Sequence, residues 1–407
     1  MQIPFSPPYI DDDTIKEVTE TLQSGWITTG PKVKQLEAEA AAYCGIENVL
    51  AVNSATSALM LLLHWYGVTR GDEVIVPAYT YCATALAVMH IGAKPIMVDV
   101  ADDFTIDPAK IKAAITAKTK AIIAVDFAGW PCDYAAIKNI LEEPAITKKF
   151  SPANNTQKQL GRMLLLADAA HSFGAKYNNT VTGALADITV FSLHAVKNIT
   201  TAEGGLICLN MPPPFINEDI YKTLRLWSLN GQTKDAFSKS KAGGWKYDIV
   251  YPGFKMNMPD VLAAMGLAQI RKYDDLLLAE RRRVFTFYSD AFSKYRWAAP
   301  PPFERLGSES SFHLYPLFIK NITEQQRDAI IEEITAQGVA VNVHFIPMPM
   351  LTVFKAAGYR IDDYPKSYFL YSGEISLPVY PQLNDVKCDY VVNAVVKAVI
   401  KVTAIEG

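Results

Sequence analysis

The amino-acid sequence predicts an α/β protein with a large domain, built on a mostly parallel mixed sheet, and a smaller C-terminal α/β domain. The chain has 407 residues, which exceeds the size at which a single hydrophobic core stops growing. Short apolar runs alternate with helical patterns from about residue 48, which is typical of a parallel sheet covered by helices on both faces. The seven predicted strands are residues 49–52, 73–76, 95–98, 121–125, 163–167, 188–191 and 206–209.

The predicted helices define the boundary between the two domains. Residues 260–294 form one long helical pattern, which the run Pro300-Pro301-Pro302 cannot continue. We therefore expect a large domain over residues 1–255, and a linking helix with the small domain, which contains two further helices, over residues 256–407. The other predicted helices are residues 14–23, 33–43, 57–66 and 134–141.

Two polar segments interrupt this pattern. Residues 148–159 (KKFSPANNTQKQ) lie between a helix and a strand, and we expect them to form a surface loop. Residues 228–253 are rich in Gly, Ser, Lys and aromatic residues and have weak periodicity, which predicts a long irregular loop. Loops of this length in compact domains are often functional.

Charge and cysteine usage argue against several functional classes. The 39 basic and 42 acidic residues give a net charge of −3, so no basic excess draws the chain to nucleic acid or to an anionic membrane. The five cysteines are scattered without a Cys-x-x-Cys pair, so we expect free thiols in a reducing compartment and no metal site. No signal-peptide pattern and no run of about 18 apolar residues occur, which favours a cytoplasmic protein.

The segment Asn53–Ala58 (NSATSA) follows a predicted strand and begins a helix. The free N–H groups and the dipole of such a helix start favour a phosphate, and Thr56 and Ser57 add hydroxyl donors. The simpler interpretation of these hydroxyls is a plain helix cap.

An acid and a lysine each follow another predicted strand. Asp168 ends a hydrophobic strand, where ligands bind in open α/β sheets, and its carboxylate can hold a cofactor ring nitrogen in the protonated form. Lys197 lies among small, apolar and hydroxyl residues, which a lysine needs to lose its proton near neutral pH and attack a carbonyl. A loop acid and a solvated surface lysine are the simpler interpretations of these residues taken singly.

Aromatic, histidine and serine side chains accompany these groups. Residues 77–84 (PAYTYCAT) offer a tyrosine that can stack on a flat ring or pack in the core. His171 and His194 can contact a cofactor or be satisfied core histidines, and Ser192 can donate to a phosphate or to the backbone. Phosphate turn, aromatic, acid and lysine follow strands of one predicted sheet in that order, which favours a shared cofactor site.

With these motifs the chain resembles the DegT-type (StrS-like) sugar aminotransferases, which have the aspartate-aminotransferase-like fold of pyridoxal-phosphate enzymes (fold type I). The lysine segment is the most specific of the matching segments, and together they span residues 24 to 378. These segments are SGWITTGPKVKQLE, NSATSAL, GDEVIVPAYTYCATA, ADAAHSFGA, FSLHAVKNITTAEGG, PGFKMNMPDVLAAMGLAQI, VHFIP and EISLP.

The resemblance implies a role for each candidate residue toward pyridoxal 5′-phosphate. Lys197 would be bonded covalently to the cofactor, Asp168 would pair with its ring nitrogen, and Tyr81 would stack on the ring. His171 would lie beside the ring, and Asn257 would reach the phosphate from the other subunit of a homodimer with shared active sites. The residues placed on the phosphate contacts are Thr56, Ser57 and Ser192. The loop over residues 227–249, which would lie near the partner's site, does not match the family closely.

The resemblance also implies the reaction. L-Glutamate would donate its amino group, leaving 2-oxoglutarate, and a nucleotide-linked keto-sugar would accept it, most commonly at C4 of a 4-keto-6-deoxy hexose. Amination at C3 is the main alternative, and neither the sugar nor the nucleotide is named by any motif. A sugar dehydratase of the family would carry histidine in place of Lys197. A cofactor-binding regulatory protein without turnover would be expected to carry a DNA-binding segment or a basic patch.

Overall fold

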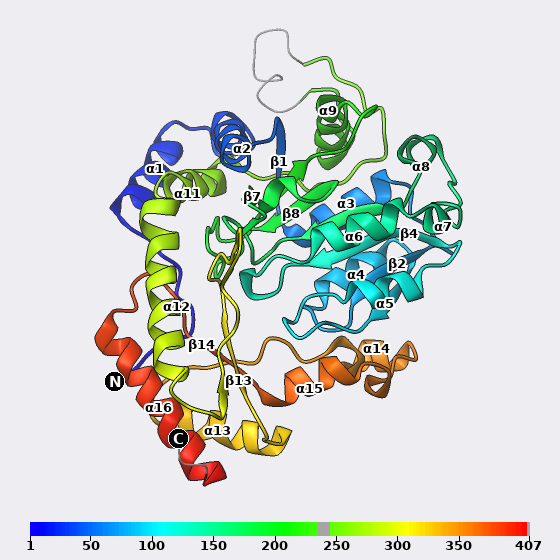
Figure 1. Cartoon of the computed structure of the whole chain (residues 1–407). Helices are drawn as coiled ribbons and strands as arrows, with labels where there is room; N and C mark the ends of the chain where they lie inside the picture. The colour runs from blue at the N-terminus through cyan, green and yellow to red at the C-terminus, as the bar shows by residue number, and fades with distance from the viewer. Residues whose placement is uncertain (235–244, 405–407) are drawn as a thin grey trace.

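The computed structural model describes residues 1–234 and 245–404, and a seven-stranded sheet forms its larger part (Figure 1). The strand order is β1-β9-β8-β5-β4-β2-β3. Four neighbouring pairs are parallel, and only the two pairs that involve β9 are antiparallel, so β9 alone runs against the other six strands. The strands are β1 (Asn48–Val52), β2 (Glu73–Pro77), β3 (Lys94–Val98), β4 (Thr119–Val125), β5 (Leu164–Asp168), β8 (Ile188–Ser192) and β9 (Gly205–Leu209).

All seven predicted strands therefore belong to one sheet, and the expected α/β fold class is confirmed. The central strands are apolar along their whole length because both faces are covered: every residue of β4 and of β5 is buried. Helices up to residue 228 lie around this sheet, either directly on its strands or on the helices that cover it. They are α1 (Asp12–Gln23), α2 (Pro31–Cys44), α3 (Ala55–Trp65), α4 (Ala83–His90), α5 (Pro108–Ala114), α6 (Tyr134–Glu142), α7 (Pro144–Thr147), α8 (Asn155–Leu160) and α9 (Asn217–Ser228).

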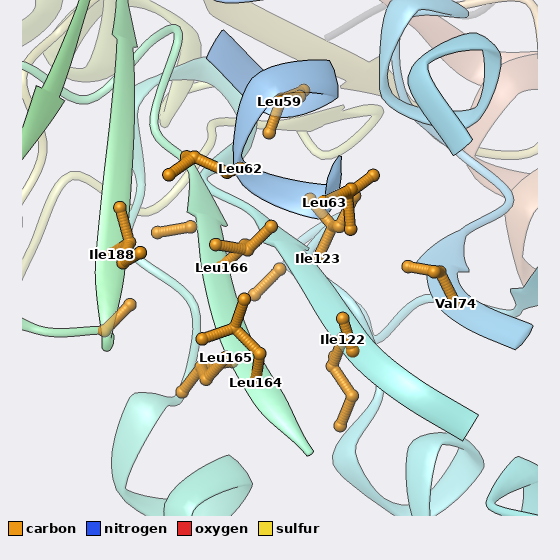
Figure 2. Packing of buried hydrophobic residues seen from close by; sticks show 14 of the residues in the cluster. Leu59, Leu62, Leu63, Val74, Ile122, Ile123, Leu164, Leu165, Leu166 and Ile188 are labelled. Carbon is orange, nitrogen blue, oxygen red and sulfur yellow. The ribbon is translucent and has the colours of Figure 1, made fainter. Parts of the chain in front are cut away.

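Helix α3 is the central element of the core on one face of the sheet. Figure 2 shows Leu59, Leu62 and Leu63 of this helix above side chains of β4 and β5, including Ile123 and Leu166. All five side chains are at most 1% exposed, and each buried leucine or isoleucine contributes about 1.5–3 kcal/mol. This packing fixes the start of α3 at the edge of the sheet where the parallel strands end.

A second, antiparallel sheet organises the C-terminal part, with the order β10-β13-β14. In Figure 1 it lies below the large sheet, and the helix α12 runs from one to the other. Its strands and helices are β10 (Ala298–Ala299), β13 (Tyr315–Ile319), β14 (Glu374–Leu377), α13 (Glu324–Ala336), α14 (Thr352–Ala356), α15 (Pro365–Gly373) and α16 (Asp385–Thr403). A further small sheet joins β11 (Glu304–Arg305), β12 (Ser308–Glu309), β6 (Lys176–Tyr177) and β7 (Thr180–Val181).

Three predictions of local structure need correction. The expected single helix over residues 260–294 is α11 (Asp260–Ile270), a π-helical segment over Tyr273–Leu278, and α12 (Ala279–Phe292). The break falls at Lys272, whose φ of −117° is not helical and whose amine binds Asp11 at 2.5 Å and Asp13 at 2.7 Å. The described C-terminal part contains four α-helices rather than two, because α14 has only five residues and the apolar residues of α15 do not gather on one face.

The third correction concerns residues 148–159, which were expected to be a surface loop. Their last five residues belong to α8, because the side chain of Asn154 accepts a hydrogen bond from the N–H of Gln157 and caps the helix. Gln157 is fully buried and donates to the carbonyl of Tyr66 at 3.0 Å. The segment is therefore anchored to the end of α3.

The expected irregular loop over residues 228–253 begins one residue after its predicted start, since Ser228 is the last residue of α9. Residues 235–244 of that loop lie outside the described residues. Its two ends approach each other: Thr233 donates to the carbonyl of Asp248, and the rings of Trp227 and Tyr251 stack with centroids 4.1 Å apart. Among the described residues, no helix is both long and apolar enough to cross a membrane.

Candidate active site

A cavity of about 510 Å³ opens where the parallel strands of the large sheet end. Asp168 is the last residue of β5 and Ser192 the last residue of β8, and Lys197 follows in the next loop. All three side chains line the cavity, since the carboxyl ends of neighbouring parallel strands meet at one edge. The neighbouring strands β5 and β8 therefore bring a carboxylate, a hydroxyl and an amine into one cavity.

The start of α3 forms another wall of the cavity. Ser54 caps the helix by accepting the N–H of Ser57 at 3.1 Å, and Ser54, Ala55 and Thr56 line the cavity. Ser57, expected on the phosphate, is not among the lining residues; its hydroxyl pairs with that of Ser54 at 2.9 Å. Thus Thr56 and Ser54 line the cavity, whereas Ser57 does not.

A glycine allows the start of α3 to approach the sheet. A Cβ atom on Gly205 would lie 2.7 Å from the amide nitrogen of Ala55 and 2.8 Å from the carbonyl carbon of Ser54. No side chain fits there without displacing the backbone. The first N–H groups of α3, which have no partner within the helix, therefore stay beside the cavity as a place for an anion.

Asp168 is buried with few partners for its charge. One oxygen accepts the hydroxyl of Thr84 at 2.7 Å, and the other accepts the N–H of Ala170 at 3.3 Å. Burial raises the pKa of Asp168, and the hydrogen bond from Thr84 opposes that shift. A cationic ring nitrogen in the cavity would restore the charged form of this carboxyl.

Lys197 is partly buried, and within the described part of the chain its amine has no hydrogen-bond or ion-pair partner. Burial lowers the pKa of Lys197 to about 8, while the charge of Asp168 acts in the opposite direction. The turn that presents it is closed by a hydrogen bond from the Lys197 N–H to the carbonyl of His194 at 2.9 Å. About half of such an amine is neutral at pH 8, and the neutral form can act as nucleophile or base.

Two buried histidines lie side by side at the cavity, with ring centroids 4.4 Å apart. Nδ1 of His171 accepts the N–H of Ala128 at 3.2 Å, so its proton is on Nε2. Burial, followed by nearby positive charge, lowers the pKa of His171 and of His313 well below the ordinary value. Both rings are therefore neutral and add no charge that would compete with Lys197.

Asn198 joins the lysine turn to the C-terminal part of the chain. It is buried, and its amide group donates to the carbonyl of Ser311 at 2.7 Å and to the hydroxyl of Tyr273 at 3.2 Å. Its carbonyl oxygen, 2.9 Å from Nδ1 of His313, must accept, which places a proton on that nitrogen. The neighbour of Lys197 thus holds three elements together.

The sequence interpretation gave no site role to five residues that line the cavity from the C-terminal part, namely His313, Leu314, Asn342, His344 and Phe345. One signal was available: the chain has only six histidines, and four of them line this cavity, His171, His194, His313 and His344. The segment VHFIP around His344 matches the family but gives the histidine no role, and nothing in the local pattern around His313 indicates a site. The tertiary structure brings both segments to the cavity.

The two tyrosines of the segment after β2 have different environments. Tyr79 is fully buried in an aromatic cluster with Phe104 and Phe127, as the core-packing interpretation expects. Tyr81 lines the cavity with 60% of its surface exposed, and its ring lies 5.9 Å from that of Phe345. Tyr81 is therefore the tyrosine free to cover a planar ligand.

Asn257 does not line the cavity of its own chain. Its side chain donates to the hydroxyl of Thr29 at 2.6 Å, and its backbone pairs with Val52 at the end of β1. Within one chain, Asn257 is therefore not placed to contact a cofactor bound in this cavity.

Comparison with known proteins gives matches over nearly the whole chain. The sequence model of the DegT/DnrJ/EryC1/StrS aminotransferase family matches residues 8–148 and 153–396, with a gap inside the segment over residues 148–159. The spore coat polysaccharide biosynthesis protein SpsC of Bacillus subtilis (strain 168) is 35% identical over 401 residues, which cover 97% of this chain and 96% of SpsC.

Solved structures show the same similarity. Spr1654 from Streptococcus pneumoniae, assigned as a sugar aminotransferase and solved in its PMP-form, superposes with a TM-score of 0.94 and 41% identity over 98% of this chain and 100% of that chain. It is also known in a PLP-form, with 40% identity. PseC from Helicobacter pylori, an aminotransferase involved in the biosynthesis of pseudoaminic acid, has a TM-score of 0.85 and 26% identity over 98% of this chain and 100% of PseC.

The cavity suits the cofactor of these proteins, because it offers an anion site at the start of α3, a buried acid and a lysine of lowered pKa. The chain therefore belongs to the DegT/DnrJ/EryC1/StrS aminotransferase family and is an aminotransferase that depends on pyridoxal 5′-phosphate.

Proposed function

We propose that this enzyme transfers an amino group from L-glutamate to a nucleotide-linked keto-sugar, at C4 of a 4-keto-6-deoxy hexose, to give an amino sugar for a surface polysaccharide or glycoconjugate. The observation that carries the proposal is the meeting of Asp168, Lys197 and the start of α3 in one cavity. The names of the relatives support the sugar: SpsC is named for spore coat polysaccharide and PseC for pseudoaminic acid.

Each proposed contact of the cofactor uses a group whose position is described above. When bound, pyridoxal phosphate supplies an electron sink that stabilises negative charge on the carbon next to the amino group. We assign its phosphate to the start of α3 with Thr56 and Ser192, with Ser57 as a further hydroxyl once it releases Ser54. Asp168 would pair with the ring nitrogen, and Tyr81 would cover the ring.

The protein residues would then move the proton and hold the charge. The amine of Lys197 would take a proton from the α-carbon of the amino donor and deliver it to C4′ of the cofactor, so that the amino group stays with the cofactor; the lowered pKa of Lys197 allows this near neutral pH. Asp168 holds a proton on the ring nitrogen throughout. His171, with its proton on Nε2, would donate a hydrogen bond beside the ring without adding a charge.

We also propose a homodimer in which each subunit completes the other's site. The described end of the long loop exposes apolar side chains to solvent: Trp245 is 73% exposed, Ile249 51% and Val250 55%. Side chains of this kind are usually covered in the functional assembly. Asn257, which is turned away from its own cavity, would reach the partner's phosphate site. Light scattering of the purified protein gives its mass in solution, and the mass of a monomer would contradict the proposed dimer.

A reducing compartment, the cytoplasm, is the setting that we propose. All five cysteines are free thiols, and four of them are buried: Cys44, Cys132, Cys208 and Cys388. Buried free thiols are common in proteins that fold without disulfides.

A panel of nucleotide-linked sugars tests the proposed reaction. The cofactor-loaded protein is incubated with L-glutamate and with either 4-keto or 3-keto sugars, and NMR of the product locates the new amino group. Amination at C4 is expected, and the Lys197→Ala variant, prepared in parallel, should give none. Amination at C3 would move the assignment to the other position, whereas transfer to simple 2-oxo acids and to no sugar would contradict the proposal.

A further inference from the structure

Glu374 is a buried carboxylic acid for which the proposed reaction has no role. It is the first residue of β14 and has no exposed surface. The hydroxyl oxygen of Ser376 lies 2.5 Å from its Oε1, and the backbone N–H of His344 donates to its Oε2 at 3.0 Å. Glu374 and Ser376 lie on the same face of the strand because alternate residues point to the same side.

Ser376 continues this contact to a residue of the cavity. Its hydroxyl oxygen lies 3.0 Å from Nδ1 of His344, whose imidazole lines the cavity together with Lys197. The ring of His344 is stacked against Phe5 with centroids 5.5 Å apart, and its edge contacts Phe345. Since Nδ1 is bonded to Ser376, Nε2 is the ring nitrogen left for a ligand.

The hydroxyl of Ser376 has one proton, so it can donate to only one neighbour at a time. The direction of both hydrogen bonds, from Glu374 to Ser376 and from Ser376 to His344, therefore depends on whether Glu374 is protonated. If Glu374 is ionised, Ser376 donates to it and accepts the proton of His344 Nδ1, which leaves Nε2 as an acceptor. If Glu374 is protonated, it donates to Ser376, Ser376 donates to Nδ1, and the proton of the imidazole is on Nε2. No proton is gained or lost by the histidine in this exchange, and only its position changes.

The charges around these hydrogen bonds make both the ionised and the protonated state of Glu374 accessible. Burial raises the pKa of Glu374 to about 8, against the hydrogen bonds from Ser376 and His344 and the charge of Arg327 on α13. Burial and the charge of Lys197 lower the pKa of His344 to about 3, so the ring stays neutral. The other titratable groups near these hydrogen-bonded residues are the hydroxyl of Tyr79 and the neutral rings of His171 and His313.

We propose that Glu374 and Ser376 are positioning residues for His344, which together fix the nitrogen that carries its proton and thereby the hydrogen bond that it offers to a substrate. Near neutral pH the protonated Glu374 leaves His344 as a donor toward the cavity. No arginine is among the residues that line the cavity in the described part of the chain, so an anionic ligand needs such donors. The ligand of His344 is a carboxylate group of the amino donor, and this identification rests on the proposed function.

The position of the proton can be measured directly. The chain has six histidines, so the cofactor-loaded protein with ¹⁵N-labelled histidine gives few signals, and a His344→Gln sample assigns the relevant one. In the wild type the proton is expected on Nε2 at about pH 6.5 and on Nδ1 at about pH 9.5, on either side of the titration of Glu374. Glu374→Gln should abolish this pH dependence. A proton position that does not change with pH in the wild type, or that changes equally in Glu374→Gln, overturns the proposal.

Kinetics with a matched serine variant give a second measurement. Ser376→Ala removes the hydrogen bonds between Glu374 and His344 without removing a charge. It should raise the KM for the amino donor about 10-fold, with kcat changed less than about 3-fold. Ser289→Ala is the control, because it deletes a hydroxyl that bonds only Tyr315, on the strand next to β14. Equal KM values for these two variants would contradict a positioning role.

The two measurements separate the two proposals. If no keto-sugar is aminated, or if another amino donor is used, the proposed function fails, while the proton of His344 can still be followed by NMR. If the sugar is aminated and the NMR signal of His344 depends on pH in the same way in the wild type and in Glu374→Gln, only the positioning role fails.

Discussion

The two walls of the cavity differ in how their side chains are held. The large sheet supplies Asp168 and Lys197 from a strand end and the turn after its neighbour, within elements fixed by parallel strand pairing. The C-terminal part supplies His313 and His344 from segments outside helices and strands, held by side-chain hydrogen bonds. The groups proposed for the chemistry therefore lie on the sheet, whereas those that would select a substrate lie where the two parts of the chain meet.

The largest expected effect tests the sheet wall alone. Lys197→Ala should lower turnover by at least about 10³-fold, because it removes both the nucleophile and the base. Borohydride reduction followed by peptide mass spectrometry should find the cofactor attached to residue 197 in the wild type only. Lys94→Ala, which alters an exposed lysine at the start of β3, is the control. Retained turnover in the Lys197 variant would remove this residue from the reaction.

Asp168→Asn should come second, with kcat lower by about 10²–10³-fold while the cofactor still binds. The asparagine keeps the shape of the side chain but cannot hold a proton on the ring nitrogen through its charge. Thr84→Val deletes the hydroxyl that bonds Asp168 and should cost only about 10-fold. If the two variants behave alike, Asp168 would act through packing rather than through charge.

Asn198→Ala tests the link between the two walls. It removes bonds to Ser311, Tyr273 and His313, so we expect kcat to fall about 10–100-fold and the free energy of unfolding to fall by about 1–3 kcal/mol. Denaturation and steady-state assays measure the two effects. Asn393→Ala, which alters an exposed asparagine of α16, is the control. A loss of stability without a loss of kcat would show that the walls need not be joined for catalysis.

The pH dependence of cofactor attachment tests the environment of Lys197. The pKa of Lys197 is lowered to about 8, and the neutral amine is the form that attacks the cofactor. The rate of attachment to the cofactor-free protein should therefore rise about tenfold per pH unit below pH 8 and level off above it. Stopped-flow absorbance follows this rate. A rise that continues to the pH of an ordinary lysine would contradict the lowered pKa.

The smallest expected effect concerns the start of α3. Ser54→Ala removes the helix cap and should lower the free energy of unfolding by about 1 kcal/mol and weaken cofactor binding a few-fold. Thr323→Ala removes the cap of α13, which lies away from the cavity, and should cost similar stability with unchanged cofactor affinity. Titration of each variant with the cofactor measures the difference. Equal affinities would mean that the start of α3 does not hold the phosphate.

Sequence patterns predicted the sheet wall well because its residues follow regular elements. The apolar runs located all seven strands, and strand ends are where ligands bind in such sheets, so Asp168, Ser192 and Lys197 could be expected together. Predictions failed where a local capping residue outweighed composition, as at Asn154, or where side-chain partners broke a helical period, as at Lys272.

The α/β class, the strands and the expectation that Asp168 and Lys197 share a site follow from the amino-acid sequence, because periodicity and strand-end position are local properties of the chain. The contacts of Glu374 and Ser376 with His344, and of His313 with Asn198, arise from the tertiary fold. Those contacts join residues 30 to 115 positions apart, and their geometry depends on how the second sheet packs against the first.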